Sequence, residues 1–173
     1  MTSEKENNHF LFDCNIWMLI LLKNQKHLFH FLQSKHYEII ITSYGMVEIL
    51  RVLKRIALRQ NITYELLEEK IWEFMKFPCI QMQFDKPISE KLIDELHRIP
   101  EYHIMTQIFQ LELKDIPYLV ASFQYNAQLI TEDKRSILDK AATIQEKLGI
   151  TILSWEHFLK KLQDHGYRIE KYD

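Results

Sequence analysis

The sequence predicts an α/β protein with a single three-layer domain, in which helices flank a central parallel sheet of about five strands. Five short apolar runs alternate with longer stretches of helical character, and this alternation favours parallel strands that are covered on both faces. The chain has 173 residues, of which 47% are hydrophobic, so one core of ordinary size accounts for all of it. Composition separates a flexible polar arm (residues 1–8), the domain (9–163) and a polar tail (164–173).

Strands are predicted where β-branched and aromatic residues cluster. A Phe-Leu-Phe run stops at Asp13, and three consecutive isoleucines mark the most strongly apolar run, at 39–41. The predicted strands are residues 10–12, 37–42, 79–84, 128–131 and 150–153.

Helices are predicted where apolar residues recur at intervals of three and four. Trp17, Trp72 and Phe74 stand at helical core spacing, so we expect all three to pack in the interior rather than to stack on bases. The predicted helices are residues 16–35 with a break near Asn24, 43–59, 64–76, 89–99, 104–113, 116–126, 134–148 and 155–163.

Composition argues against several classes of protein. The formal net charge of −2 provides no global basic field for nucleic acid, and three glycines are too few for a glycine-rich phosphate loop. Cys14 and Cys79 form neither a metal motif nor a disulfide framework, which favours a reducing, cytoplasmic setting. His27 and His30 have no third partner for zinc. No apolar run approaches the roughly 20 residues of a membrane span.

Four acidic residues stand where a sheet of this kind has its functional edge. Asp13 and Asp133 each follow a predicted strand, Asp115 begins a predicted helix, and Glu48 interrupts an apolar helical stretch. Ligands of parallel sheets collect beyond the carboxyl ends of the strands. Clustered carboxylates suit Mg²⁺ or Mn²⁺, which prefer oxygen ligands.

Each acid also has a purely structural explanation. Asp is a preferred helix N-cap, and this role suits all three aspartates. Glu48 stands three residues before Arg51, at the spacing of an ordinary surface ion pair. The metal hypothesis therefore depends on the four carboxylates meeting in space.

The segments around these acids resemble the motifs of PIN-domain nucleases, a family that includes toxin-like ribonucleases of the VapC and PilT N-terminus types. Residues 10–16 resemble the opening strand, which ends in Asp and carries Asn after one intervening residue. Residues 40–51 resemble the second motif, a strand and then a helix with an inward Glu. Residues 113–122 resemble the helix that starts with Asp, and 129–134 contain the Thr-x-Asp-Lys pattern. The four motifs occur in the family order, and the resemblance covers residues 8–161.

The resemblance implies a metal-dependent endoribonuclease that hydrolyses RNA phosphodiester bonds. It implies that Mg²⁺ or Mn²⁺ is bound by four residues that also form the catalytic set: Asp13, Glu48, Asp115 and Asp133. Asn15 and Thr131 would orient these carboxylates or the attacking water. The resemblance further implies a toxin of a toxin–antitoxin pair, with a small antitoxin as partner and a homodimer as assembly. Family members often carry one more Asp where this chain has Arg135.

Contacts to substrate phosphates require local cations. Lys134 and Arg135 are the favoured candidates because they directly follow Asp133. The other cations near the motif segments are more often solvated surface than ligand contacts; they are Lys23, Lys26, Lys54, Arg55 and Arg59.

Three other functions remain open on the sequence. A catalytically inactive PIN-like binding scaffold is favoured by Arg135 in place of an acid. A haloacid-dehalogenase-like phosphatase would use Asp13 as nucleophile, but it needs a second Asp where this chain has Asn15. A phosphoacceptor receiver domain would find its Asp after the third strand in Asp85, but it lacks the acid pair after the first.

Overall fold

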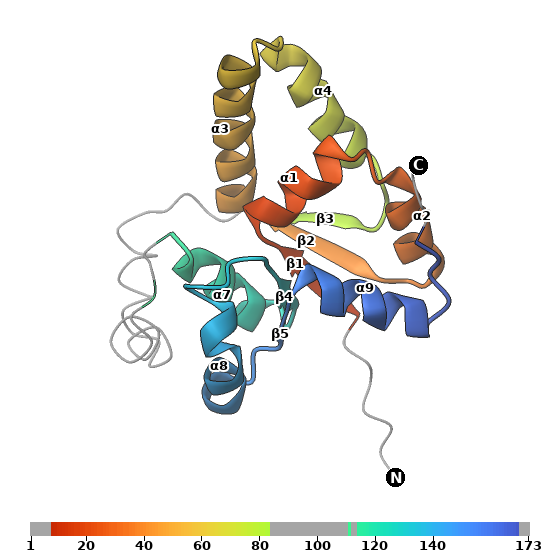
Figure 1. The fold of residues 1–173 in the computed structure, drawn as a ribbon. Helices are drawn as coiled ribbons and strands as arrows, with labels where there is room; N and C mark the ends of the chain where they lie inside the picture. The colour runs from red at the N-terminus through yellow and green to blue at the C-terminus, as the bar shows by residue number, and fades with distance from the viewer. Residues whose placement is uncertain (1–7, 84–110, 112–113, 170–173) are drawn as a thin grey trace.

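The computed structural model describes residues 8–83, 111 and 114–169 (Figure 1). Its centre is one parallel sheet with the strand order β3-β2-β1-β4-β5, so the predicted fold class is confirmed. The strand bounds differ from the predicted ones by one or two residues. The strands are β1 (His9–Phe12), β2 (Glu38–Thr42), β3 (Ile80–Gln83), β4 (Gln128–Ile130) and β5 (Ile152–Leu153).

Most of the predicted helices are present at the expected places. The break near Asn24 is confirmed, because Asn24 adopts a positive φ of 48° between two separate helices. The helices predicted at 89–99 and 104–113 lie outside the described residues, apart from Leu111. The described helices are α1 (Cys14–Leu22), α2 (Lys26–Ser34), α3 (Ser43–Gln60), α4 (Tyr64–Phe74), α7 (Ile116–Gln124), the short 3₁₀ helix η2 (Leu138–Lys140), α8 (Ala141–Leu148) and α9 (Trp155–Asp164).

The helix predicted over 134–148 is wrong in its first half, because α8 begins only at Ala141. Asp133 stops it. The Asp133 side chain accepts a hydrogen bond from the Ser136 backbone N–H at 3.0 Å, and its carbonyl oxygen accepts from Leu138 at 2.9 Å. Side-chain bonds of this kind compete with the helical ladder, so residues 134–137 form turns instead.

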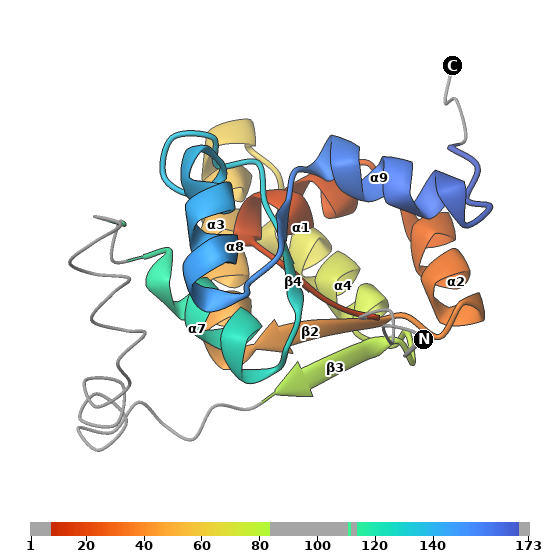
Figure 2. The same cartoon turned by 90° about the horizontal axis from the view of Figure 1, so that it is seen from below.

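Alternating side chains along the strands create a core on each face of the sheet. Phe10 and Phe12 of β1 belong to one core, together with residues from α1, α2, α3, α4 and α9. Leu11 of β1 and Leu129 of β4 belong to the other, together with residues from α7 and α8. The sheet therefore lies between two helical layers, and α3 and α4 project together beyond it (Figures 1 and 2).

Aromatic side chains fix α9 on the first face. Phe158 lies 5.0 Å from Phe10 and 5.5 Å from Phe12 between ring centroids, in edge-to-face contacts, a geometry that typically adds about 0.5–1.5 kcal/mol per pair. Residues just beyond α9 are also attached. The Tyr167 hydroxyl lies 2.6 Å from His27 Nε2, and the Tyr37 hydroxyl lies 2.6 Å from His165 Nδ1.

The prediction for the three helical aromatics is confirmed for two of them. Trp17 and Phe74 are buried, whereas Trp72 is 42% exposed. Helix α4 buries Leu67, Ile71 and Phe74, which recur at intervals of four and three. Trp72 directly follows Ile71, about 100° further round the helix, so its side chain faces outward.

Candidate active site

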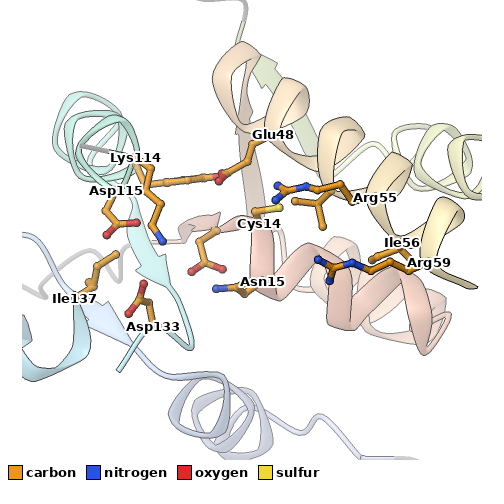
Figure 3. A pocket seen from close by; sticks show the side chains of 13 residues that line it. Cys14, Asn15, Glu48, Arg55, Ile56, Arg59, Lys114, Asp115, Asp133 and Ile137 are labelled. Carbon is orange, nitrogen blue, oxygen red and sulfur yellow. The ribbon is translucent and has the colours of Figure 1, made fainter. Parts of the chain in front are cut away.

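The strand order brings the four acids to one edge of the sheet. β1 lies between β2 and β4, the arrangement at which the carboxyl ends of parallel strands leave a crevice. Asp13 follows β1, Asp133 follows β4, α3 carries Glu48 after β2, and Asp115 precedes α7. All four line a single cleft of about 360 Å³, and Figure 3 labels Glu48, Asp115 and Asp133 within it.

Asp13 is the most deeply placed of the four, at 5% exposure. Its carboxylate caps α1 by accepting the Ile16 N–H at 3.0 Å and also accepts the Thr131 hydroxyl. Burial, and to a smaller extent the nearby charge of Glu48, raise the pKa of Asp13 to about 6. The structural explanation and the site explanation therefore both apply to this residue, because a helix cap also stands in the cleft.

Thr131 connects the ends of β1 and β4. Its side chain is fully buried, donates to Asp13 and accepts the Asp133 N–H at 3.0 Å. One hydroxyl thus orients the carboxylate after β1 and the backbone that presents the carboxylate after β4.

Asp115 and Asp133 meet through Ser136. The Ser136 hydroxyl donates to Asp115, while its backbone N–H donates to Asp133 at 3.0 Å. The turn that replaces the predicted helix start is therefore part of the site. Ser136 is itself buried, so this link is shielded from water.

Glu48 is held by Tyr118, which follows Asp115 on α7. The Tyr118 hydroxyl donates to Glu48, and burial together with Glu48 raises the pKa of Tyr118, so the phenol stays protonated and remains a donor. Among the described residues no ion pair joins Glu48 to Arg51. The surface-pair explanation for Glu48 is wrong, because the side chain turns into the cleft.

Three cations and one thiol also line the cleft. Arg55 and Arg59 of α3 stand at one end, and Lys114 points into the cleft beside Asp115 (Figure 3). Cys14 also lines it, but burial and the charges of Glu48 and Asp13 raise the pKa of its thiol to about 12. The thiol is therefore protonated at neutral pH and unsuited to attack as a thiolate.

Of the remaining residues predicted for the site, only some line the cleft. Asn15 is exposed and lines the cleft beside Asp13. Lys134 and Arg135 are exposed on the turn after Asp133 and do not line the cleft. Glu132, which directly precedes Asp133, does not line the cleft; its carboxylate accepts the Trp155 N–H at 2.7 Å at the start of α9, a structural role.

Sequence reasoning missed the two hydroxyl donors Tyr118 and Ser136. Tyr118 stands three residues after Asp115, and Ser136 three residues after Asp133. The second spacing is typical of a capping turn and was a usable signal. The contact of Tyr118 with Glu48 joins residues 70 apart in the chain, for which no local pattern exists.

The donor chemistry of the cleft fits a hard divalent cation, because four carboxylates supply oxygen ligands. Within the part of the chain that the structure describes, however, no group of three or more His, Cys, Asp or Glu side chains is arranged to hold a metal ion. The cleft has the right ligands but is not a preformed metal cage.

The chain has a PIN-like α/β fold, and acidic residues line a cleft at the carboxyl edge of its five-stranded parallel sheet. The strand order also differs from the 2-1-3-4-5 order of receiver domains, so that alternative is wrong.

The chain is similar to a solved structure described as VapBC2 from Rickettsia felis bound to a DNA fragment from its promoter. The match has a TM-score of 0.57 and 13% sequence identity, and it covers 85% of this chain and 98% of the other. No protein-family model matches this chain, and neither does any curated protein. At this identity the likeness concerns the fold.

No helix of the described residues is both long and apolar enough to span a membrane.

Proposed function

We propose that this protein is a Mg²⁺- or Mn²⁺-dependent endoribonuclease that hydrolyses RNA phosphodiester bonds in the acidic cleft. One observation carries the proposal: four acids from distant parts of the sequence line the same cleft at the carboxyl edge of a PIN-like sheet. Surface acids and helix caps have no reason to converge in this way.

In this proposal Asp13, Glu48, Asp115 and Asp133 bind the ion. A divalent ion bound there would stabilise charge on the phosphate and lower the pKa of a water molecule. Thr131 and Ser136 keep the carboxylates of Asp13 and Asp115 oriented through their hydroxyls. A carboxylate oxygen has more than one acceptor position, so these hydrogen bonds are compatible with a metal ligand.

Asn15 and Tyr118 have different parts in this proposal. Asn15 is exposed in the cleft beside Asp13, where its amide is placed to donate to a phosphate oxygen or to water. Tyr118 holds Glu48 at the wall of the cleft through its hydroxyl, and a cation bound there would share the Glu48 carboxylate with this donor.

A cleavage assay tests the proposal. Wild-type protein, Asp13→Asn and Asp115→Asn are incubated with labelled single-stranded RNA and either Mg²⁺ or Mn²⁺. We expect both variants to lose more activity than the roughly 10–100-fold typical of a residue that only orients a metal ligand. Asp139→Asn is the matched control, because Asp139 is exposed on η2 and does not line the cleft. Cleavage that needs no metal, or that survives both substitutions, would contradict the proposal.

The second candidate is a PIN-like scaffold that binds a partner without catalysis. Two observations favour the scaffold. The described residues contain no ready-made group of metal ligands, and Arg135 stands where PIN-domain nucleases often carry an acid. Measuring the binding of Mn²⁺ to the wild type and to Asp115→Asn separates the two candidates. The nuclease should bind the ion and lose affinity for it on substitution, whereas a scaffold with no metal function should bind no ion in the cleft.

We also propose a small antitoxin partner and a homodimer, in keeping with a toxin of a toxin–antitoxin pair. Two observations support this: the similar structure is described as a VapBC2 assembly on promoter DNA, and four large apolar side chains are exposed on the projecting pair α3 and α4, namely Val47, Leu58, Leu66 and Trp72. Exposed apolar groups of this size are suited to a protein contact. Light scattering of the purified chain gives its assembly state directly.

A further inference from the structure

We infer that Arg55 and Arg59 form a phosphate-binding subsite beside the four acids, and that the RNA strand next to the cut phosphate runs along α3. This inference rests on the proposed function and assigns the part of the cleft that holds the substrate. It differs from the sequence-based prediction, which favoured Lys134 and Arg135 for this task.

The placement of the two arginines follows from helical spacing. Glu48, Val52, Arg55 and Arg59 recur along α3 at intervals of four, three and four, which puts them on one helix face. All four line the cleft, as does Ile56, which directly follows Arg55. The guanidinium groups point from α3 into the cleft, Arg55 towards Cys14 and Glu48 and Arg59 towards Asn15 (Figure 3). Helix α3 therefore contributes Glu48 to the acids of the cleft and two arginines to its other end.

Both arginines are available to a ligand. They are exposed, and neither has an ion-pair or hydrogen-bond partner among residues 8–83, 111 and 114–169. The acids do not use these charges, since Glu48 is bound by Tyr118 and Asp13 by Thr131. Guanidinium groups bind phosphate oxygens through paired N–H donors.

The spacing suits consecutive phosphates of one strand. Side chains four apart on a helix have Cβ atoms about 5–6 Å from each other, so Arg55 and Arg59 are placed to contact two successive phosphates of a strand that runs along α3. Arg55 also lines the cleft together with Asp13, Cys14 and Glu48. A phosphate on Arg55 would thus adjoin the acids directly.

The described residues that line the cleft offer no exposed aromatic ring on which a base could stack. The aromatic residue among those that line the cleft is Tyr118, which is 5% exposed and bound to Glu48. Without an exposed ring for stacking, binding at this end depends on phosphate contacts, which fix the position of the strand and carry no sequence information. We therefore expect binding that tolerates changes of sequence and weakens with salt.

The test measures RNA binding without cleavage. A fluorescein-labelled single-stranded oligoribonucleotide is titrated with the full chain in a chelator, and anisotropy is followed at several salt concentrations. We expect Arg55→Gln/Arg59→Gln to weaken binding about tenfold or more and to reduce the slope of log K against log salt by about 0.7 per arginine. Arg55→Lys/Arg59→Lys retains both charges and should retain most of the slope.

Lys54→Gln/Lys70→Gln is the matched control. It removes two exposed positive charges from α3 and α4 outside the acidic cleft, so net charge changes equally. An equal loss of binding in this control, an unchanged affinity in the arginine variant, or no RNA binding by the wild type would overturn the inference. Circular dichroism establishes that each variant is folded.

The two proposals fail separately. Metal-dependent cleavage by the wild type, with arginine variants that bind RNA normally, would overturn the subsite and leave the nuclease intact. Loss of binding in the arginine variants, without any metal-dependent cleavage by the wild type, would overturn the nuclease and support the subsite.

Discussion

Asp13 is the residue whose ionisation links the cleft to folding. Its pKa is raised from 3.8 to about 6, mainly by burial. An acid with a raised pKa binds its proton more tightly in the folded state than in the unfolded state. Its contribution to stability is therefore complete below about pH 4 and is lost as pH rises through about 6.

This shift makes a prediction for the metal-free protein. Between pH 4 and 7, Asp13→Asn should gain stability relative to the wild type by on the order of 3 kcal/mol, because one pKa unit corresponds to about 1.4 kcal/mol. Urea unfolding of both proteins in the presence of a chelator, at several pH values, measures this difference in the free energy of unfolding. Asp139→Asn should show no such trend, and a difference between Asp13→Asn and wild type that is independent of pH would contradict the assignment.

Hydroxyl donors accompany three of the acids. Thr131 donates to Asp13, Ser136 to Asp115 and Tyr118 to Glu48. A buried carboxylate without a donor is costly, so these contacts explain how the metal-free cleft tolerates acids in a confined space. Thr131 is part of a sequence motif, whereas Tyr118 is recognised only from its contact.

At the scale of elements, the start of α3 determines where Glu48 points. Thr42 caps this helix by accepting the Gly45 N–H at 3.1 Å, which starts the helix directly after β2. The face that carries Glu48, Arg55 and Arg59 is set from this point. A shift of the helix start by one residue would turn that face by about 100°.

Substitution of Gly45, in the first turn of α3, tests how closely the start of this helix is packed. A Cβ at Gly45 would lie 3.4 Å from Thr42 Oγ1 and 3.8 Å from Tyr118 Cε1, which is ordinary contact, and Ala is favoured over Gly in helices by up to about 1 kcal/mol. We expect Gly45→Ala to stabilise the protein by a few tenths to about 1 kcal/mol in thermal or urea unfolding.

Gly149→Ala is the opposing case. Gly149 ends α8 with a φ of 69°, a conformation that costs a residue with a Cβ roughly 1 kcal/mol. This variant should be less stable than the wild type. If Gly45→Ala were the more destabilising of the two, the contacts around the start of α3 would be tighter than described.

For the whole molecule, the four acids predict that divalent metal raises stability. A ligand that binds only the folded state adds about 2.7 kcal/mol at a concentration one hundred times its dissociation constant. We expect Mn²⁺ or Mg²⁺ to raise the Tm of the wild type in a concentration-dependent way, and to do so much less for Asp115→Asn. Differential scanning calorimetry measures this shift.

Asp139→Asn again serves as the control and should respond to metal like the wild type. A Tm that is indifferent to both ions would contradict metal binding, whatever the result of the cleavage assay. This measurement therefore checks the site independently of any chosen RNA.

Much of this protein was predictable from local patterns. Apolar runs of three to five residues locate the strands, and their ends locate Asp13 and Asp133, because a buried strand requires apolar side chains and its end does not. The helix prediction was wrong over 134–140, where the Asp133 side chain competes for the backbone N–H groups that a helix needs. The prediction for Trp72 was wrong because its position lies beside, not on, the buried face of α4.

The sequence by itself determined the α/β class, the parallel sheet and the position of Asp13 and Asp133 at its carboxyl edge, since these depend on periodicity and on the residues that follow each strand. Only the tertiary structure decided which side chains share the cleft. It placed Arg55 and Arg59 beside the acids and left Lys134 and Arg135 outside. The physical reason is that a local pattern gives the face of an element, whereas a contact between side chains depends on how elements far apart in the chain pack against the sheet.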